Sequence, residues 1–283
     1  MTLELTPDLR AWPNLEGFFA SLPWYDLPEM QDANDALWRA LALALEARGV
    51  DGVPPKLDRR LPYSVDWNGA CLLTQTCGYP IFTTCLGQFT IVATPCYDAP
   101  GCAGEQHRSF IVVNARSSVA TLGDLRGATF AINEPDSNSG MNLARRLVAP
   151  LARAGRFFAS TIVTGSHAAS AERVAAREID AAAVDCVSFA LLQRYRPSVT
   201  ANLRIVAETP TSPAPPLVTS RLSPKSTLSA LRAALRDVLD DPAHAQVRAA
   251  LFLGDVAFTD ESAYAPVMTY EREAIAFGYP VLA

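Results

Sequence analysis

Small polar residues gather where one predicted helix begins. Between an apolar run that predicts a strand at 128–132 and an amphipathic helical pattern lie Ser137, Asn138, Ser139 and Gly140. The free backbone N–H groups and the positive dipole end of such a helix start can bind an anion, and a glycine lets a ligand approach the backbone closely. The same residue types also make an ordinary helix cap. The segment by itself therefore fits both a capped helix and an oxyanion site.

Other predicted loops carry side chains that suit the same purpose. His167 begins a predicted helix and can donate a hydrogen bond to an anion. Asp185 ends a predicted strand at its carboxyl edge, where α/β sheets place their ligands. Two aromatic residues, Tyr25 and Tyr79, follow apolar runs on loops beside prolines. Each residue also has a structural interpretation, as a cap or a packing residue, but their shared position after strands predicts that they meet at one cleft.

The cysteines allow a rival hypothesis. Cys77 could be a thiol nucleophile with His107 or His167 as its base, but no order of cysteines and histidines matches a nucleophile motif. The six cysteines include no CxxC pair, so we expect no metal, and we expect no cofactor and no catalytic residue. Cys96 and Cys102 flank a turn-rich loop that a disulfide could close; buried free thiols are the alternative.

The elements that must position these residues alternate between strand and helix patterns, which indicates an α/β fold with mostly parallel sheets. Residues 114–208 form one compact set, and a proline-rich connector at 209–216 follows it. The segments 1–113 and 209–283 would then form the other lobe. Two chain crossings between the lobes predict a hinge, with a ligand cleft between the lobes.

Composition excludes several classes of protein. Charged residues are only 19% of the chain and the net charge is −5, so a nucleic-acid partner is not expected. No apolar run reaches 18 residues, so we expect no membrane-spanning helix. The N-terminal residues lack a basic stretch followed by an apolar one, so no secretory leader is visible. The chain is then cytoplasmic, or its leader has been removed.

Several stretches, in order along the chain, resemble the phosphate/phosphite/phosphonate-binding family of ABC-transporter substrate-binding proteins. They read ASLPWYDLPE, TQTCGYP, ATPCYDAPGC, NEPDSNSGMN, TGSHAASAERVAAREIDAAAVD and PPLVTS. The resemblance implies a two-lobed type II periplasmic-binding fold, a periplasmic location and a permease partner. It implies that the phosphoryl group meets Ser137, Asn138, Ser139 and His167, and that Tyr25 and Tyr79 wall the cleft. Asp185 matches an acidic position that meets the ligand's amine in aminophosphonate binders.

Three departures from the family pattern bear on the ligand. Asn138 stands where a threonine or serine is common, and the connector at 209–216 offers no second acidic residue. No leader is visible either. We therefore expect a solute-binding protein, not an enzyme, that captures phosphate, phosphite or a phosphonate for uptake. A cytoplasmic two-lobed ligand sensor is the alternative.

Overall fold

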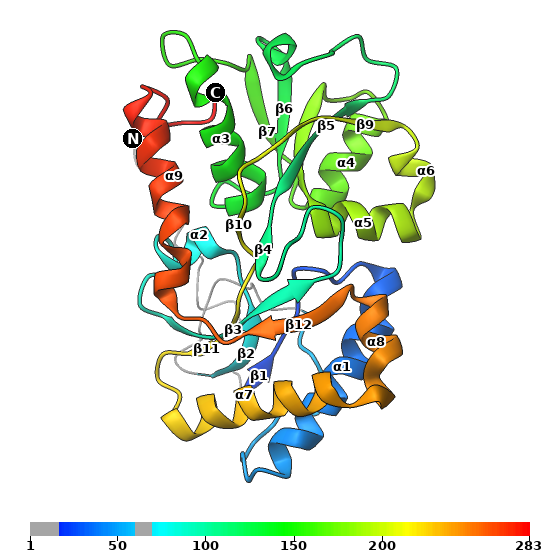
Figure 1. Ribbon diagram of the computed structural model, residues 1–283, viewed down its shortest axis with the longest axis vertical. Helices are drawn as coiled ribbons and strands as arrows, with labels where there is room; N and C mark the ends of the chain where they lie inside the picture. Colours follow the sequence, from blue (N-terminus) through cyan, green and yellow to red (C-terminus); the bar gives the residue numbers. More distant parts are fainter. Residues whose placement is uncertain (1–16, 60–69) are drawn as a thin grey trace.

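The computed structural model describes residues 17–59 and 70–283, and its elements divide between two lobes, each built on a five-stranded sheet (Figure 1). The expected two-lobed α/β fold is confirmed. The stretch at the N-terminus where no leader is visible lies almost wholly outside the described residues. Within the described residues, no helix has the length and apolar character needed to cross a membrane.

The first sheet forms the lower lobe in Figure 1. Its strands, in spatial order, are β1 (Phe19–Ala20), β2 (Cys71–Gln75), β11 (Leu217–Ser220), β3 (Phe89–Tyr97) and β12 (Leu253–Ala257). Its helices are α1 (Gln31–Glu46), α7 (Lys225–Asp240) and α8 (Ala245–Ala250). Leu37, Leu41 and Leu45 recur at helical spacing and are buried on α1, so a single apolar stripe fastens this helix to the lobe.

The second sheet forms the upper lobe. Its strands, in spatial order, are β7 (Ser160–Val163), β6 (Thr129–Ile132), β8 (Ala181–Asp185), β5 (Ser109–Asn114) and β9 (Leu203–Glu208). Its helices are α3 (Leu143–Val148), α4 (His167–Ala175), α5 (Cys186–Tyr195), α6 (Pro197–Thr200) and α9 (Ala265–Ala276). Alternate residues of β8 join different apolar clusters, Ala182 with Ala171 of α4 and Ala183 with Ala144 of α3. Helices therefore cover both faces of this sheet, which explains its continuous apolar strands.

Both sheets are mixed, so the expectation of mostly parallel sheets was wrong in this detail. The parallel pairs are β1 with β2, β6 with β7 and β6 with β8. The remaining pairs in the two sheets are antiparallel. In the second sheet the reason is that the chain enters along β5 and leaves along β9, in opposite directions. The carboxyl ends of β6, β7 and β8 consequently share one edge, which faces the first lobe.

The crossings between the lobes are more extensive than the sequence indicated. Strand β4 (Gln106–His107) pairs with β10 (Ser212–Pro213) where the first two crossings run side by side. Strand β5 pairs only within the second sheet, although the expected boundary fell after residue 113. Helix α9 then crosses again to pack on α3, and the Ala283 carbonyl accepts hydrogen bonds from Phe157 and Phe158. We therefore propose that the boundary between the lobes precedes β5. We also propose that the second lobe includes the C-terminal segment.

Candidate functional site

The helix start at Ser137–Gly140, called here the Ser137 helix start, follows β6 directly. The backbone of Ser137 is extended, and its Oγ accepts a hydrogen bond of 2.9 Å from the Gly140 N–H. The next turn, Asn138–Asn142, is a π-helical turn in which the Leu143 N–H reaches back to the Asn138 carbonyl. Such widened turns occur often at functional sites. Helix α3 continues from this turn, so the helix start is backed by further helical turns.

Gly140 is required here by space. A Cβ atom at this position would lie 1.8 Å from Oδ1 of Asn133, far inside van der Waals contact. Asn133 directly follows β6, and its side chain is buried against the helix start. Glycine therefore lets the helix begin close to the end of the strand, while the expected close approach of a ligand to Gly140 stays a prediction.

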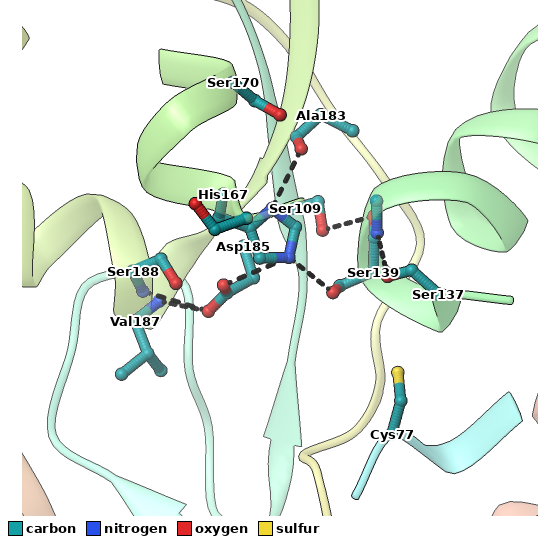
Figure 2. A network of polar contacts seen from close by, with 12 residues as sticks. Cys77, Ser109, Ser137, Ser139, His167, Ser170, Ala183, Asp185, Val187 and Ser188 are labelled. Atoms are coloured by element: carbon teal, nitrogen blue, oxygen red, sulfur yellow. Dashed lines mark hydrogen bonds and ion pairs between the residues drawn. The ribbon is translucent and has the colours of Figure 1, made fainter. Parts of the chain in front are cut away.

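Ser139, His167 and Asp185 form one chain of polar contacts across three helix starts (Figure 2). Nε2 of His167 lies 2.8 Å from Oγ of Ser139 and 3.4 Å from Oδ2 of Asp185. Its Nδ1 lies 3.1 Å from the Ala183 carbonyl. A carbonyl can only accept, so Nδ1 carries a hydrogen and Nε2 is free to accept or gain a proton. The structure thus brings together three of the residues that the sequence singled out.

The charge state of this chain follows from its burial. Burial lowers the pKa of His167, while Asp185 and the Ala183 carbonyl act in the opposite direction. The imidazole is accordingly neutral at neutral pH, and it accepts the hydrogen of the Ser139 hydroxyl. Asp185 caps helix α5, because its Oδ1 accepts the N–H groups of Val187 and Ser188. Its Oδ2 is buried without a hydrogen-bond partner among the described residues.

Tyr25 closes this group from the first lobe. Its hydroxyl donates a hydrogen bond of 3.0 Å to Oδ1 of Asp185. Its ring lies edge-on to Tyr97 of β3, with ring centroids 5.1 Å apart at 82°. Burial first, and then the Asp185 carboxylate, raise the pKa of Tyr25 well above its ordinary value. Tyr25 is therefore a neutral donor that links the two lobes across the site.

Cys77 contacts the Ser137 helix start from the first lobe. Its Sγ accepts the Asn138 N–H at 3.0 Å. The Asn138 side chain is already engaged, because its Nδ2 donates to Oγ of Ser212 at 2.8 Å. Burial raises the pKa of Cys77 to about 11, while the ring nitrogens of His167 contact Ser139 and Ala183 and Nδ1 of His107 has no partner among the described residues. The thiol is therefore protonated and lacks a base, which argues against the nucleophile hypothesis.

Tyr79 does not lie with the other candidate residues. Its hydroxyl donates a hydrogen bond of 2.5 Å to Oε1 of Glu271 on α9. The Arg145 guanidinium lies 5.8 Å from the centre of its ring. The expectation that Tyr79 walls the cleft stays a prediction; in this structure its hydroxyl and ring contact a carboxylate and a guanidinium of the second lobe.

Residues that the sequence analysis did not place at the site also belong to it. Tyr97 packs on Tyr25, and its hydroxyl accepts a hydrogen bond from Gln75. His107 is buried on β4, and its Nδ1 has no partner among the described residues. Burial lowers the pKa of His107 to about 4, against the effect of the neighbouring Asp185. The Thr76 hydroxyl, just after β2, is likewise buried without a partner among the described residues. Unpartnered buried polar atoms of this kind are expected where a ligand completes a site.

A cavity of about 220 Å³ opens between the lobes beside this group. Tyr25 and Trp24 line it from the first lobe, and His167, Glu134 and Leu191 line it from the second. None of the described residues that line it is lysine or arginine. Burial and the nearby Asp136 carboxylate raise the pKa of Glu134. The cavity can therefore receive an uncharged or positively charged group beside the helix starts, while the helix starts suit an anion.

All six cysteines are free thiols, so the pairing of Cys96 with Cys102 is not formed. Cys96 lies within β3, and its Sγ faces the Thr94 carbonyl at 4.0 Å. Cys102 instead lies beside Cys186 of the second lobe. No cluster of three or more metal-ligating side chains occurs among the described residues.

Comparison with known proteins identifies a family and several solved structures of similar fold. The profile of the family described as ABC transporter, phosphonate, periplasmic substrate-binding protein matches residues 87–264, which is well over half of the chain. A search of curated proteins found no significant match.

Three solved structures illustrate the likeness in fold. PhnD1 from Prochlorococcus marinus in complex with methylphosphonate has a TM-score of 0.75 at 15% identity, covering 92% of this chain and 98% of PhnD1. A binding protein component of an ABC phosphonate transporter from Pseudomonas aeruginosa has a TM-score of 0.73 at 16% identity, covering 93% and 88%. A Xanthomonas citri protein bound to chloride has a TM-score of 0.69 at 16% identity, covering 92% and 98%.

Proposed function

Because the chain belongs to the family of phosphonate periplasmic substrate-binding proteins of ABC transporters, we propose that it captures a small phosphorus oxyanion between its lobes and presents it to a permease. The periplasm is the proposed compartment, as for the family. The observation that carries the proposal is the convergence of three helix starts, after β6, β7 and β8, on the chain Ser139–His167–Asp185.

The phosphoryl group is proposed to bind at the Ser137 helix start. The helix start offers two donors, the Asn138 N–H, which now donates to Cys77, and the Ser139 hydroxyl, which now donates to His167. Both can turn to phosphoryl oxygens once the lobes part, and the helix dipole favours their negative charge. His167 is held by its Nδ1–H on Ala183, so its Nε2 can hold the proton that a phosphonate or phosphate monoanion carries. These residues need no lysine or arginine to bind the anion.

The organic end of the ligand is proposed to extend into the 220 Å³ cavity. Trp24 and Leu191 offer apolar contact there, and Glu134 offers an acidic side chain. Glu134 supplies the second acidic group that is missing from the connector at 209–216. An amine on the ligand would find both Glu134 and the aromatic ring of Trp24, a combination that suits cations.

Titration calorimetry of the purified protein tests the proposal, with methylphosphonate, phosphite, phosphate and sulfate as ligands. We expect at least one phosphorus oxyanion to bind, and Ser139→Ala to weaken it by about 10- to 100-fold, since one hydrogen bond to a charged group is lost. Ser262→Ala, at an exposed serine in the first turn of η7 (Glu261–Tyr264) whose N–H donates to the Asp260 cap, is the matched control and should leave the affinity unchanged. Failure of all three phosphorus oxyanions to bind the wild-type protein would overturn the proposal.

A further inference from the structure

Two thiols from distant parts of the chain meet beside the site. Sγ of Cys102 and Sγ of Cys186 are 3.4 Å apart, across 84 positions of sequence. Cys102 lies on the connection from β3 to β4, where the chain first crosses between lobes, and Cys186 is the first residue of α5. We propose that Cys102 and Cys186 are a disulfide-forming pair that joins this crossing to the second lobe.

The backbones around the two cysteines are already held together. A Cβ atom added to Gly101 would lie 2.9 Å from Cβ of Cys186, so the loop passes directly over the start of α5. The Cys186 N–H donates to the Arg108 carbonyl at 2.9 Å, and the Cys102 N–H donates to the Ala99 carbonyl at 3.0 Å. The loop and the helix start are thus fixed independently of the thiols. Forming the bond requires the two sulfur atoms to move together by little more than one ångström, which side-chain rotation can supply.

The competing pair suggested by sequence spacing lacks this geometry. Cys96 is six positions from Cys102, but its side chain projects from β3 toward the Thr94 carbonyl. Cys96 also lies within the ladder of β3 and β12, where it is paired with Asp255, so the position of its backbone is fixed.

The chemistry balances with a disulfide oxidant, such as oxidised glutathione or a protein disulfide. The Cys102 thiol, the more exposed of the two, loses its proton and attacks one sulfur of the oxidant, and one thiol leaves. The Cys186 thiol then loses its proton and attacks the Cys102 sulfur, and the second thiol leaves. Two protein thiols become one disulfide, and the oxidant is reduced to two thiols. The hydrogen bond from Cys186 lowers the pKa of Cys102, which favours Cys102 as the first thiol to react.

The disulfide would affect the site because one of its cysteines is next to a site residue. Cys186 directly follows Asp185, so the disulfide would fasten the lobe crossing to the residue next to the buried carboxylate. It would also close a loop that contains most of the second lobe, which restricts the unfolded chain. We expect the oxidised protein to unfold about 5–10 °C above the reduced protein.

Peptide mapping after oxidation with glutathione disulfide and alkylation tests the pairing directly. We expect a cross-linked species joining the peptides of Cys102 and Cys186, two hydrogen atoms lighter than the reduced pair, which dithiothreitol abolishes. Complete alkylation of both cysteines, or a Cys96–Cys102 cross-link, would overturn the proposal. Mapping of the wild-type protein needs no variant and no ligand, so its outcome does not depend on the proposed function.

Thermal unfolding with and without dithiothreitol gives a second readout. The wild-type protein and Cys96→Ser should both lose the 5–10 °C of stabilisation on reduction. Cys102→Ser and Cys186→Ser should show no effect of the reductant. An equal effect of dithiothreitol on Cys102→Ser and on the wild-type protein would contradict the assignment.

Discussion

The helix starts after β6 and β8 face each other across His167 but are capped in opposite ways. At the Ser137 helix start the caps are a neutral hydroxyl and, from the other lobe, a neutral thiol. At the start of α5, the Asp185 helix start, a buried carboxylate accepts two backbone N–H groups. A helix start capped by a carboxylate has its positive end already compensated, whereas one capped by neutral groups keeps it for a ligand. The difference favours the Ser137 helix start as the proposed anion site.

The largest effect is expected when the Ser137 helix start is given a carboxylate cap like that of the Asp185 helix start. We expect Ser137→Asp to weaken methylphosphonate binding by at least about 1000-fold, because a buried carboxylate would repel the anion. Its melting temperature should stay close to that of the wild-type protein, because aspartate is a good helix cap. Calorimetry and thermal unfolding measure the two effects. Ser137→Asn, which is similar in size and uncharged, is the matched control and should bind at least 100-fold better than Ser137→Asp.

The buried side chain of His107 predicts that the protein loses stability in acid. Burial lowers the pKa of His107 from 6.5 to about 4, so below pH 6.5 the unfolded chain binds a proton that the folded chain excludes. The contribution of His107 to the free energy of unfolding is complete above pH 6.5 and declines as the pH falls toward 4. We expect this loss to reach about 3 kcal/mol.

Denaturant unfolding between pH 7 and pH 4 measures this effect. His107→Gln should lose about 3 kcal/mol less than the wild-type protein over that range. Identical slopes for the His107→Gln and wild-type proteins would show that His107 is not a buried neutral histidine.

The unpartnered oxygen at the Asp185 helix start sharpens the comparison for ligand choice. Oδ2 of Asp185 lies 3.4 Å from Nε2 of His167, which is proposed to accept the hydrogen of a phosphonate monoanion, whereas a sulfonate has none to donate. We expect Asp185→Asn to reduce the preference for methylphosphonate over methanesulfonate by about tenfold, since asparagine keeps an oxygen for the cap but can donate from its amide. Calorimetry with both ligands measures the ratio. Glu134→Gln should leave this ratio unchanged, and an unchanged ratio in Asp185→Asn would remove Asp185 from the selection.

The smallest effect is expected at Tyr79, which the family resemblance names as a cleft residue but whose hydroxyl contacts Glu271. Tyr79→Phe removes a hydroxyl that binds Glu271 rather than the site. Its affinity for methylphosphonate should stay within about twofold of the wild-type value, while its free energy of unfolding should fall by about 1 kcal/mol. A large loss of affinity, measured by calorimetry, would mean that Tyr79 reaches the ligand when the lobes rearrange.

Sequence reasoning reached the family and the two-lobed fold because these depend on local patterns. The apolar run at β8 and the helix start at Ser137 were both visible in a few consecutive residues. His167 and Asp185 could be placed at one edge, because helices that follow parallel strands begin at the same edge of a sheet. The convergence of Ser139, His167 and Asp185 follows from that rule alone.

Sequence reasoning failed where long-range contacts decide. Nothing local indicates that β5 joins the second sheet, because its apolar residues suit either lobe. The direction of Tyr79 depends on Glu271, which lies 192 positions away. The partner of Cys102 depends on Cys186, whereas Cys96 was the nearer choice in sequence. His107 was considered only as a catalytic base, because its burial and its unpartnered nitrogen are properties of the folded chain.

The contact between Cys77 and the Asn138 N–H has a consequence for the resting population of the protein. It gives this arrangement of the lobes a hydrogen bond that needs no ligand, which favours closed molecules before capture. A ligand that binds at the Ser137 helix start, as proposed, would compete with the thiol, and its apparent dissociation constant would equal the intrinsic one divided by the fraction of molecules that are open. Weakening this contact would tighten binding without adding any group that touches the ligand. The affinity for the ligand thus depends partly on the free energy needed to break the contact between Cys77 and Asn138 and part the lobes.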